Sequence, residues 1–258
     1  MPLLGLGVYD MYKAEAEKAV EDALRVGYRL IDTASMYENE IEIGNAIKNT
    51  GLDRKEIFLT TKLNNTDHGY DQALKAFDDS LKKLDQDYVD LYLIHWPIKE
   101  GRAASWKALE KLYEDKRVKA IGVANYNITL LEDLKSTANI VPAVNQIEFS
   151  PWLFQEDLLN YCKTAGIQVQ SYSPITRGLK FSDERLALLC KKYNRTPAQI
   201  VLNWHLQHGI STIPKSSKKE RLIENFEATS FTLSKEEVKI MNGFNENFRI
   251  CDDPQTYL

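Results

Sequence analysis

The sequence contains little cysteine, and no spacing that would organise it. Its three cysteines, Cys162, Cys190 and Cys251, lie far apart in a chain of 258 residues. There is no Cys-x-x-Cys pair and no Cys/His ligand spacing, so the pattern argues against a disulfide framework and a structural zinc site. We therefore expect no metal centre and a reducing, cytoplasmic environment.

Long apolar runs and an excess of positive charge are also missing. No window approaches about 20 consecutive apolar residues, so no membrane-spanning helix is predicted. With 33 basic and 37 acidic residues, the formal net charge is −4, which gives no electrostatic reason to expect nucleic acid or an anionic membrane as partner. The apolar start Met1–Tyr9 carries Pro and Gly and no charged region, and is interpreted as a strand rather than a signal peptide.

Short apolar runs that are rich in β-branched residues alternate with helical patterns along most of the chain. The predicted strands are Leu4–Tyr9, Arg29–Asp32, Ile57–Lys62, Val89–His95, Val118–Val123, Ala143–Ile147, Gln168–Tyr172 and Ser211–Pro214. This alternation predicts an α/β protein in which residues 1–258 form a single (β/α)₈ TIM-barrel domain. An open doubly wound sheet is the alternative, but Gly5-Leu-Gly7 lacks the third glycine of a dinucleotide-binding fingerprint.

Several helix boundaries are predicted from local signals. Apolar residues recur at helical spacing in Tyr70–Leu84 and in Ala14–Val26. Gly27 is placed to end the helix Ala14–Val26. Capping boxes are predicted at Thr196, Ser217 and Ser234, each with Gln or Glu three residues later. The tail after Gly243 has no period, so we expect it to run over the barrel as a loop.

Four polar side chains lie at or just beyond the ends of three successive predicted strands. They are Asp32, Tyr37, Lys62 and His95. In a parallel barrel these strand ends meet at the C-terminal mouth, where such barrels keep their chemistry. An acid, a phenol, an ammonium and an imidazole that converge there predict a site that delivers a proton.

Seven sequence strings, taken in order, resemble the aldo-keto reductase family over essentially the whole chain. They are Asp32-Thr-Ala-Ser-Met-Tyr37-Glu-Asn-Glu, Thr61-Lys62, Asp87-Tyr-Val-Asp-Leu-Tyr-Leu-Ile-His95-Trp-Pro97, Gly122-Val-Ala-Asn125, Asn145-Gln146-Ile-Glu148, Tyr172-Ser-Pro174 and Ile213-Pro-Lys215-Ser216. The resemblance implies a (β/α)₈ barrel that reduces aldehydes and ketones with NADPH, bound across the mouth without a Rossmann module. We expect a cytoplasmic monomer that acts on a small-molecule carbonyl compound.

The resemblance assigns the four catalytic positions to Asp32, Tyr37, Lys62 and His95. Tyr37 is the expected general acid, and its phenol would ordinarily titrate at about 10. A nearby cation lowers a phenol's pKa, so we expect Lys62 to lower that of Tyr37 while Asp32 orients the ammonium. His95, if neutral, would donate a hydrogen bond to the substrate carbonyl.

The cofactor positions also follow from the resemblance. Basic residues at the start of a helix are unfavourable unless an anion binds there, and the loop after the last barrel strand often holds phosphate. The similarity places Lys215, Ser216 and Arg221 on the ribose 2′-phosphate, which favours NADPH over NADH, and Glu224 and Asn225 at the adenine. At the other end it places Tyr172 against the nicotinamide ring, Asn125 and Gln146 on its carboxamide, and Ser173 near the pyrophosphate.

The expected substrate pocket departs from the common family pattern. The resemblance implies that Tyr9, Asn64, His95 and Trp96 line it, with Asn64 and Tyr9 where the family often has Trp. Ala124 stands where the family commonly has Ser, which removes one hydroxyl contact to the carboxamide. The loop Ile98–Ser105 and the C-terminal tail are short, so small or polar carbonyl compounds are expected rather than steroids.

Two other functions remain open from the sequence. Some relatives use this barrel as a regulatory or structural subunit, so a non-catalytic NADPH-binding protein is the main alternative. Lys62 could instead form a Schiff base in an aldolase-like barrel. Pairing with Asp32 argues against that chemistry, because a carboxylate keeps the ammonium charged.

Overall fold

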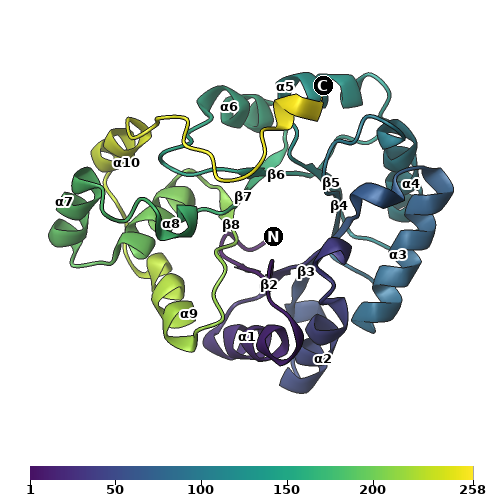
Figure 1. Ribbon diagram of the computed structural model, residues 1–258, viewed down its shortest axis with the longest axis horizontal. Coiled ribbons are helices and arrows are strands. Elements are labelled where there is room, and N and C mark those ends of the chain that lie inside the picture. The colour runs from purple at the N-terminus through teal and green to yellow at the C-terminus, as the bar shows by residue number, and fades with distance from the viewer. Residues whose placement is uncertain (258) are drawn as a thin grey trace.

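The computed structural model describes residues 1–257 and has eight parallel strands in sequential order, surrounded by helices (Figure 1). The strands are β1 Leu6–Gly7, β2 Leu30–Asp32, β3 Phe58–Leu63, β4 Leu91–Ile94, β5 Ile121–Ala124, β6 Val144–Glu148, β7 Gln168–Tyr172 and β8 Ser211–Thr212. A parallel bridge between Leu4 and Thr212 joins the two ends of the sheet. The sheet therefore closes into the predicted (β/α)₈ barrel, and the doubly wound alternative is wrong.

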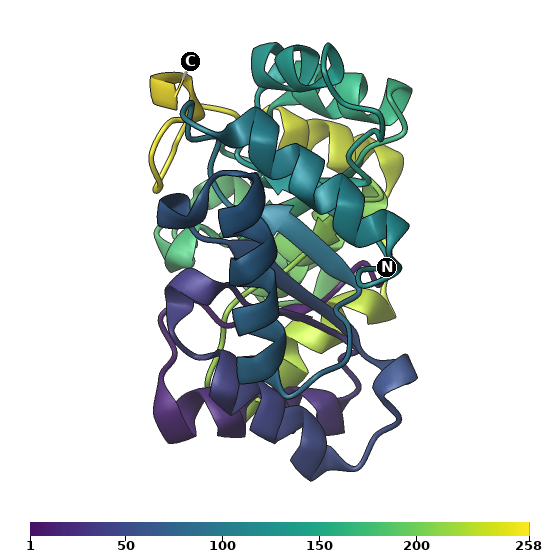
Figure 2. The same cartoon turned by 90° about the vertical axis from the view of Figure 1, so that its right-hand side faces the viewer.

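Helices follow the strands and cover the outside of the barrel (Figures 1 and 2). The α-helices are α1 Lys13–Val26, α2 Glu40–Thr50, α3 Tyr70–Leu84, α4 Arg102–Glu114, α5 Ile128–Lys135, α6 Glu156–Thr164, α7 Glu184–Tyr193, α8 Pro197–Gln207, α9 Lys219–Phe226 and α10 Lys235–Asn242. Short 3₁₀ turns are η1 Ser35–Tyr37, η2 Arg54–Glu56, η3 Asn65–Asp67, η4 Thr176–Gly178, η5 Glu227–Ser230 and η6 Pro254–Tyr257. Each of the eight predicted strands overlaps an observed one; β3, β5 and β6 end one residue later than predicted, and the first and last strands shrink to two residues.

Local signals set most helix boundaries as predicted. The helix Tyr70–Leu84 has the predicted bounds, and Gly27 ends α1 with a φ of 124° while its N–H donates to Ala23 and Leu24. The capping boxes at Thr196 and Ser234 are both formed. The box at Ser217 is wrong.

Helix α9 instead begins after Lys218, which provides no side-chain cap. The Oγ of Ser216 accepts the N–H of Lys218. This bond closes a turn before the helix and replaces the predicted pairing of Ser217 with Glu220.

The core has two parts because successive strand residues point to opposite faces of the sheet. In β4, Tyr92 and Ile94 belong to the large apolar cluster between strands and helices. Leu91 and Leu93 pack with Val144 in a separate small cluster. The latter therefore fills the barrel interior, and the polar side chains lie beyond it, toward the mouth.

Helix α8 carries a histidine, His205, that is buried in this helix-packed layer. Its Nδ1 lies 2.8 Å from the carbonyl oxygen of Val201, and its Nε2 lies 3.1 Å from that of Phe149. Burial lowers the pKa of His205 to about 4 from its ordinary 6.5. The unfolded chain therefore takes up this proton at a higher pH than the folded chain does.

Acidification should consequently destabilise the fold through His205. The stabilisation is present above pH 6.5 and is lost as the pH falls toward 4, by about 2 kcal/mol at pH 5 and about 3 kcal/mol in full. Urea unfolding at pH 7.5, 6 and 5 would measure it. A His205→Gln variant should lose correspondingly less over this range, because the other three histidines are present in both proteins. Equal losses would contradict the assignment.

Among residues 1–257, no helix is both long and apolar enough to cross a membrane. Within the same residues, no group of three or more His, Cys, Asp or Glu side chains is placed to hold a metal ion.

Candidate active site

A cavity of about 590 Å³ lies at the C-terminal ends of the strands. Three of the four expected catalytic side chains, Asp32, Tyr37 and His95, line it. Lys62 is fully buried behind them, with none of its side chain exposed to solvent. The fold therefore brings together the four groups that the sequence places at the ends of successive strands.

Local structure sets the position of Tyr37 above the end of β3. The chain leaves β2 at Asp32 and turns through η1, which ends at Glu38 in the left-handed region with φ 55°. The hydroxyl of Ser35 in η1 donates to the carbonyl oxygen of Lys62, at 2.9 Å. This bond fastens the turn to β3 and holds the phenol beside the ammonium.

Lys62 uses its ammonium to connect the other groups. The Nζ donates to Asp32 Oδ1 at 2.5 Å and to the carbonyl oxygen of Thr33 at 2.8 Å. It also lies 3.5 Å from the hydroxyl of Tyr37. An ammonium has three donors, and these three acceptors account for all of them. No donor is left over, and the amine is enclosed by protein, which disfavours Schiff-base chemistry at Lys62.

The sequence predicts that Lys62 lowers the pKa of Tyr37. For the protein without a bound nucleotide, this direction is wrong. Burial raises the pKa of Tyr37 well above its ordinary 10, and the carboxylate of Asp32 adds to the increase. Burial also lowers the pKa of Lys62, against the attraction of Asp32. Tyr37 is therefore protonated at neutral pH, so its O–H can donate into the cavity while its oxygen faces the ammonium of Lys62.

His95 is neutral, which is the condition for its expected role as a donor. Burial lowers its pKa well below 6.5, and the positive charge of Lys62 lowers it further. Its ring stands edge-on to that of Tyr37, with centroids 5.5 Å apart. A neutral imidazole beside a protonated phenol gives two hydrogen-bond donors for one oxygen atom in the cavity.

The second oxygen of Asp32 is held by a chain of amides inside the barrel. Gln146 Nε2 donates to Asp32 Oδ2 and to Gln170 Oε1, both at 2.7 Å. Gln170 in turn donates to Ser211 Oγ at 3.2 Å. Sequence reasoning missed Gln170; the signal was an amide in the middle of β7, where the three central residues of the strand are buried.

The side chains expected at the nicotinamide all line the cavity. They are Asn125, Gln146 and Tyr172, and Ser173 lines it as well. The amide of Asn125 donates to the carbonyl oxygen of His95 at 2.9 Å and accepts the hydroxyl of Tyr172 at 2.8 Å. Asn125 has a φ of 65° and Ser173 a φ of 49°, so both lie where the chain turns sharply after a strand.

The expected phosphate residues divide into two groups. Lys215 and Arg221 line the cavity, whereas Ser216, Glu224 and Asn225 are not among its lining residues. Lys215 Nζ donates to the carbonyl oxygen of Asp10 at 2.7 Å, across the rim of the mouth. Glu224 accepts the hydroxyl of Thr196 at 2.6 Å, so its carboxylate joins α9 to the cap of α8.

The expected substrate residues are also divided. Tyr9 and Trp96 line the cavity, but Asn64 does not. The ring of Tyr9, which is 53% exposed, packs edge-on against that of Tyr37 with centroids 5.1 Å apart. The C-terminal tail contributes residues that sequence reasoning missed, namely Ile250, Cys251 and Asp252. The tail crosses the barrel as predicted, apart from the 3₁₀ turn η6.

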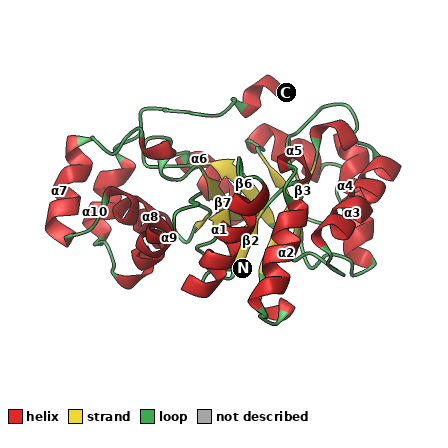
Figure 3. Ribbon diagram, turned by 60° about the horizontal axis from the view of Figure 1, so that its bottom comes forward, coloured by secondary structure: helices red, strands yellow, loops and turns green. Residues whose placement is uncertain are grey.

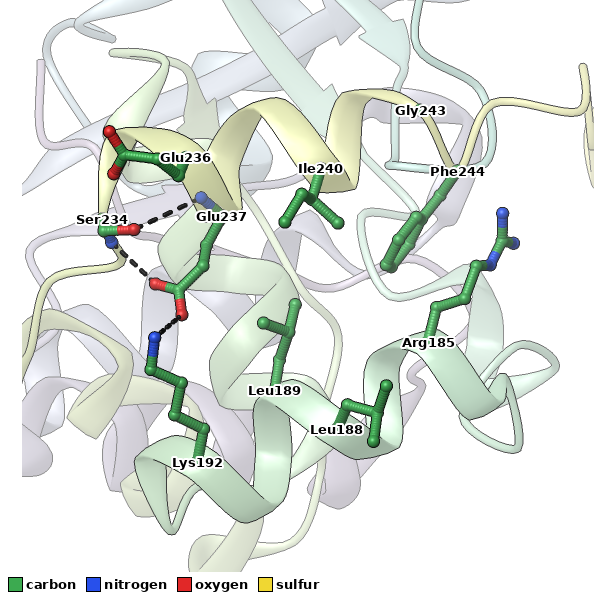
Figure 4. A pocket seen from close by; sticks show the side chains of 10 residues that line it. All are labelled: Arg185, Leu188, Leu189, Lys192, Ser234, Glu236, Glu237, Ile240, Gly243 and Phe244. Atoms are coloured by element: carbon green, nitrogen blue, oxygen red, sulfur yellow. Dashed lines mark hydrogen bonds and ion pairs between the residues drawn. The ribbon is translucent and has the colours of Figure 1, made fainter.

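A second hollow lies outside the barrel between α7 and α10 (Figure 4). Leu188 and Leu189 of α7 face Ile240 of α10, and Phe244 closes one end. Lys192 pairs with Glu237, which caps α10. Both charges are thus committed to the helix contact, and the hollow lacks the converging polar groups that reaction chemistry needs.

Comparison with known proteins supports the family resemblance seen in the sequence. The statistical model of the Aldo/keto reductase family matches residues 4–246. Glyoxal reductase of Bacillus subtilis (strain 168) is 45% identical over 259 residues, which cover 100% of this chain and 94% of that protein.

Solved structures agree with the fold. MGS-M4, an aldo-keto reductase enzyme from a Medee basin deep-sea metagenome library, superposes with a TM-score of 0.96 at 44% identity, over 98% of this chain and 94% of that one. A variant of Gox0644 in complex with NADPH superposes with a TM-score of 0.94 at 39% identity, over 99% and 94% of the two chains.

Proposed function

The chain belongs to the aldo/keto reductase family, and we propose that it reduces small carbonyl compounds with NADPH, with Tyr37 as the general acid. The observation that carries this proposal is the contact series from Asp32 through Lys62 to the hydroxyl of Tyr37 at the cavity wall. The names of the relatives support reduction as the direction of the reaction and NADPH as the cofactor. One is a glyoxal reductase, and another was crystallised with NADPH.

The cavity fits an extended dinucleotide phosphate by its chemistry. Arg221 lines the cavity and makes no side-chain hydrogen bond or ion pair within residues 1–257. An unpaired guanidinium suits the bidentate recognition of a phosphate. Elsewhere in the cavity, Asn125 and Tyr172 offer an amide and an aromatic face near His95. We assign the 2′-phosphate to Lys215, Ser216 and Arg221, and the nicotinamide to Asn125, Gln146 and Tyr172.

When bound, NADPH supplies the hydride that reduces the carbonyl carbon. His95 and Tyr37 then hold the carbonyl oxygen between two hydrogen-bond donors. As negative charge builds on this oxygen, Tyr37 gives it a proton, and the resulting phenolate is stabilised by the ammonium of Lys62 3.5 Å away. Asp32 keeps Lys62 charged and oriented.

We propose small carbonyl compounds as the substrates, and the name of the glyoxal reductase relative makes glyoxal the first to test. The phenol rings of Tyr9 and Tyr37 and the tail residues Ile250 and Cys251 confine the space beside the two donors. Absorbance loss of NADPH, measured with glyoxal, simple aldehydes and bulky aromatic aldehydes, tests the proposal. Binding of NADPH without turnover of any carbonyl would favour the regulatory alternative.

The Arg221→Ala variant should raise the KM for NADPH about 10- to 100-fold, since a charge-assisted bond to phosphate contributes about 1.5–3 kcal/mol. The KM for NADH, which lacks this phosphate, should stay nearly constant. Lys219→Ala removes a neighbouring charge of α9 that is not among the cavity-lining residues, and serves as the matched control. An equal effect of Arg221→Ala on both cofactors would rule out the 2′-phosphate assignment.

A further inference from the structure

The C-terminal tail crosses the mouth of the barrel after α10 (Figures 1 and 3). The backbone N–H groups of Glu246 and Phe248 donate to the carbonyl oxygen of Trp152, at 3.2 and 2.9 Å. At the far end, the ring of Tyr257 packs on that of Trp96, with centroids 5.3 Å apart. Between these two anchors, Ile250, Cys251 and Asp252 form part of the cavity wall.

One buried carboxylate holds this middle part of the tail. Glu148 ends β6 and is 3% exposed. Its Oε1 accepts the N–H of Ile250 at 2.7 Å, and its Oε2 accepts the N–H of Cys251 at 3.1 Å. The guanidinium of Arg249 lies 3.9 Å from Oε2. The two amides belong to residues that line the cavity.

Within residues 1–257, every one of these partners of the Glu148 carboxylate belongs to the tail, and none to the barrel. An ionised carboxylate that is buried without partners is very costly. The amides of Ile250 and Cys251 and the charge of Arg249 therefore compensate much of this burial when the tail lies over the mouth, and the charge of Arg177 adds to them. Conversely, the tail has no periodic apolar pattern of its own that would hold Ile250 and Cys251 in place.

We propose that Glu148 is a positioning residue that clasps the C-terminal tail, so that the tail forms the outer wall of the substrate cavity and limits the enzyme to small carbonyl compounds. This inference rests on the proposed function. Glu148 lies two residues beyond Gln146, so the same strand holds both the support for Asp32 and the tail. Selectivity for size is then set by a residue that need not touch the substrate.

The test compares Glu148→Gln and Glu148→Ala with the wild-type enzyme. Gln has the same shape but loses the charge and turns an N–H₂ group toward a backbone N–H. The matched control is Glu110→Gln, because Glu110 is also buried and its Oε1 accepts two backbone N–H groups, from Asn139 and Ile140. Those residues precede β6, at the opposite end of the barrel from the mouth.

Steady-state kinetics with glyoxal and with a naphthaldehyde give the first readout. In both Glu148 variants, the ratio of kcat/KM for glyoxal to that for the naphthaldehyde should fall about tenfold, which corresponds to about 1.4 kcal/mol. The change should lie mainly in KM, since Tyr37 and Lys62 are untouched. Glu110→Gln should keep the wild-type ratio.

Trypsin gives a second readout that needs no activity. It cleaves after Arg249, at the first residue of the clasped segment, and releases residues 250–258, which mass spectrometry detects. Opening of the tail should speed this cleavage about tenfold in the Glu148 variants under native conditions and leave it unchanged in Glu110→Gln. Circular dichroism shows whether each variant is folded, and Glu148→Gln serves if Glu148→Ala is not.

The two readouts separate the outcomes. Faster cleavage together with the changed ratio supports the clasp, whereas values equal to those of Glu110→Gln overturn it. Faster cleavage with an unchanged ratio overturns the role in selectivity. If the wild-type enzyme turns over no carbonyl compound, the proposed function fails, and the cleavage rates alone decide whether Glu148 holds the tail.

Discussion

Tyr37→Phe should lower kcat for carbonyl reduction by about 10²–10⁴-fold, the usual contribution of a positioned general acid. The variant removes one oxygen atom and keeps the ring that packs between Tyr9 and His95. NADPH binding, followed by quenching of its fluorescence, should therefore be nearly unchanged. Loss of both binding and turnover would instead mean that Tyr37 is structural.

Tyr92→Phe is the control for removal of a buried hydroxyl. The hydroxyl of Tyr92 in β4 has no hydrogen-bond partner among the described residues, and the ring packs against Phe77 of α3. Its removal should leave kcat at the wild-type value.

The pH dependence of the wild-type enzyme gives an independent check on Tyr37. Since the pKa of Tyr37 is raised and that of His95 is lowered, neither group should titrate between pH 6.5 and 9, and neither should change kcat there. A fall in kcat within that range, absent from Tyr37→Phe, would contradict the direction of the Tyr37 pKa.

Lys62→Met should abolish reduction and also destabilise the fold. Without the ammonium, a phenolate at Tyr37 has no cation beside it, so kcat should fall by at least about 10²-fold. Asp32 is left as a buried carboxylate that keeps only the amide of Gln146, and breaking a buried pair on one side costs about 3–5 kcal/mol. Urea unfolding and NADPH oxidation measure the two effects separately.

The double variant Asp32→Asn/Lys62→Met separates catalysis from stability. Removing both charges together should restore much of the free energy of unfolding, because no unpaired charge remains buried. It should not restore turnover, since Tyr37 still lacks its cation. Recovery of activity in the double variant would show that Lys62 acts only by balancing Asp32.

Much of the fold follows from local patterns in this sequence. The β-branched runs that end at Asp32, Lys62 and His95 predict the strands, and the helical spacing of apolar residues predicts Tyr70–Leu84 to the residue. The capping signals at Thr196 and Ser234 work because their partners lie three residues away. The signal at Ser217 fails because the neighbouring Ser216 closes the turn first.

The convergence of the catalytic side chains was also predictable. In a parallel barrel, the C-terminal ends of all strands lie at the same end of the barrel, so the three strand ends must meet at the mouth. The hydrogen-bond partners of each side chain could not be predicted. The amide of Gln146 is bonded to Asp32 and Gln170, and which partners it finds depends on strands 24 and more than 100 residues apart in the chain.

By itself, the sequence determined the alternation of strands and helices, the barrel class, and which residue types reach the mouth. These follow from periodicity and from neighbours a few residues apart. Only the tertiary structure decided that the pKa of Tyr37 is raised rather than lowered, and that Glu148 holds the tail from 102 residues away. Burial and long-range hydrogen bonds set both, because the cost of a buried charge depends on every group that surrounds it in space.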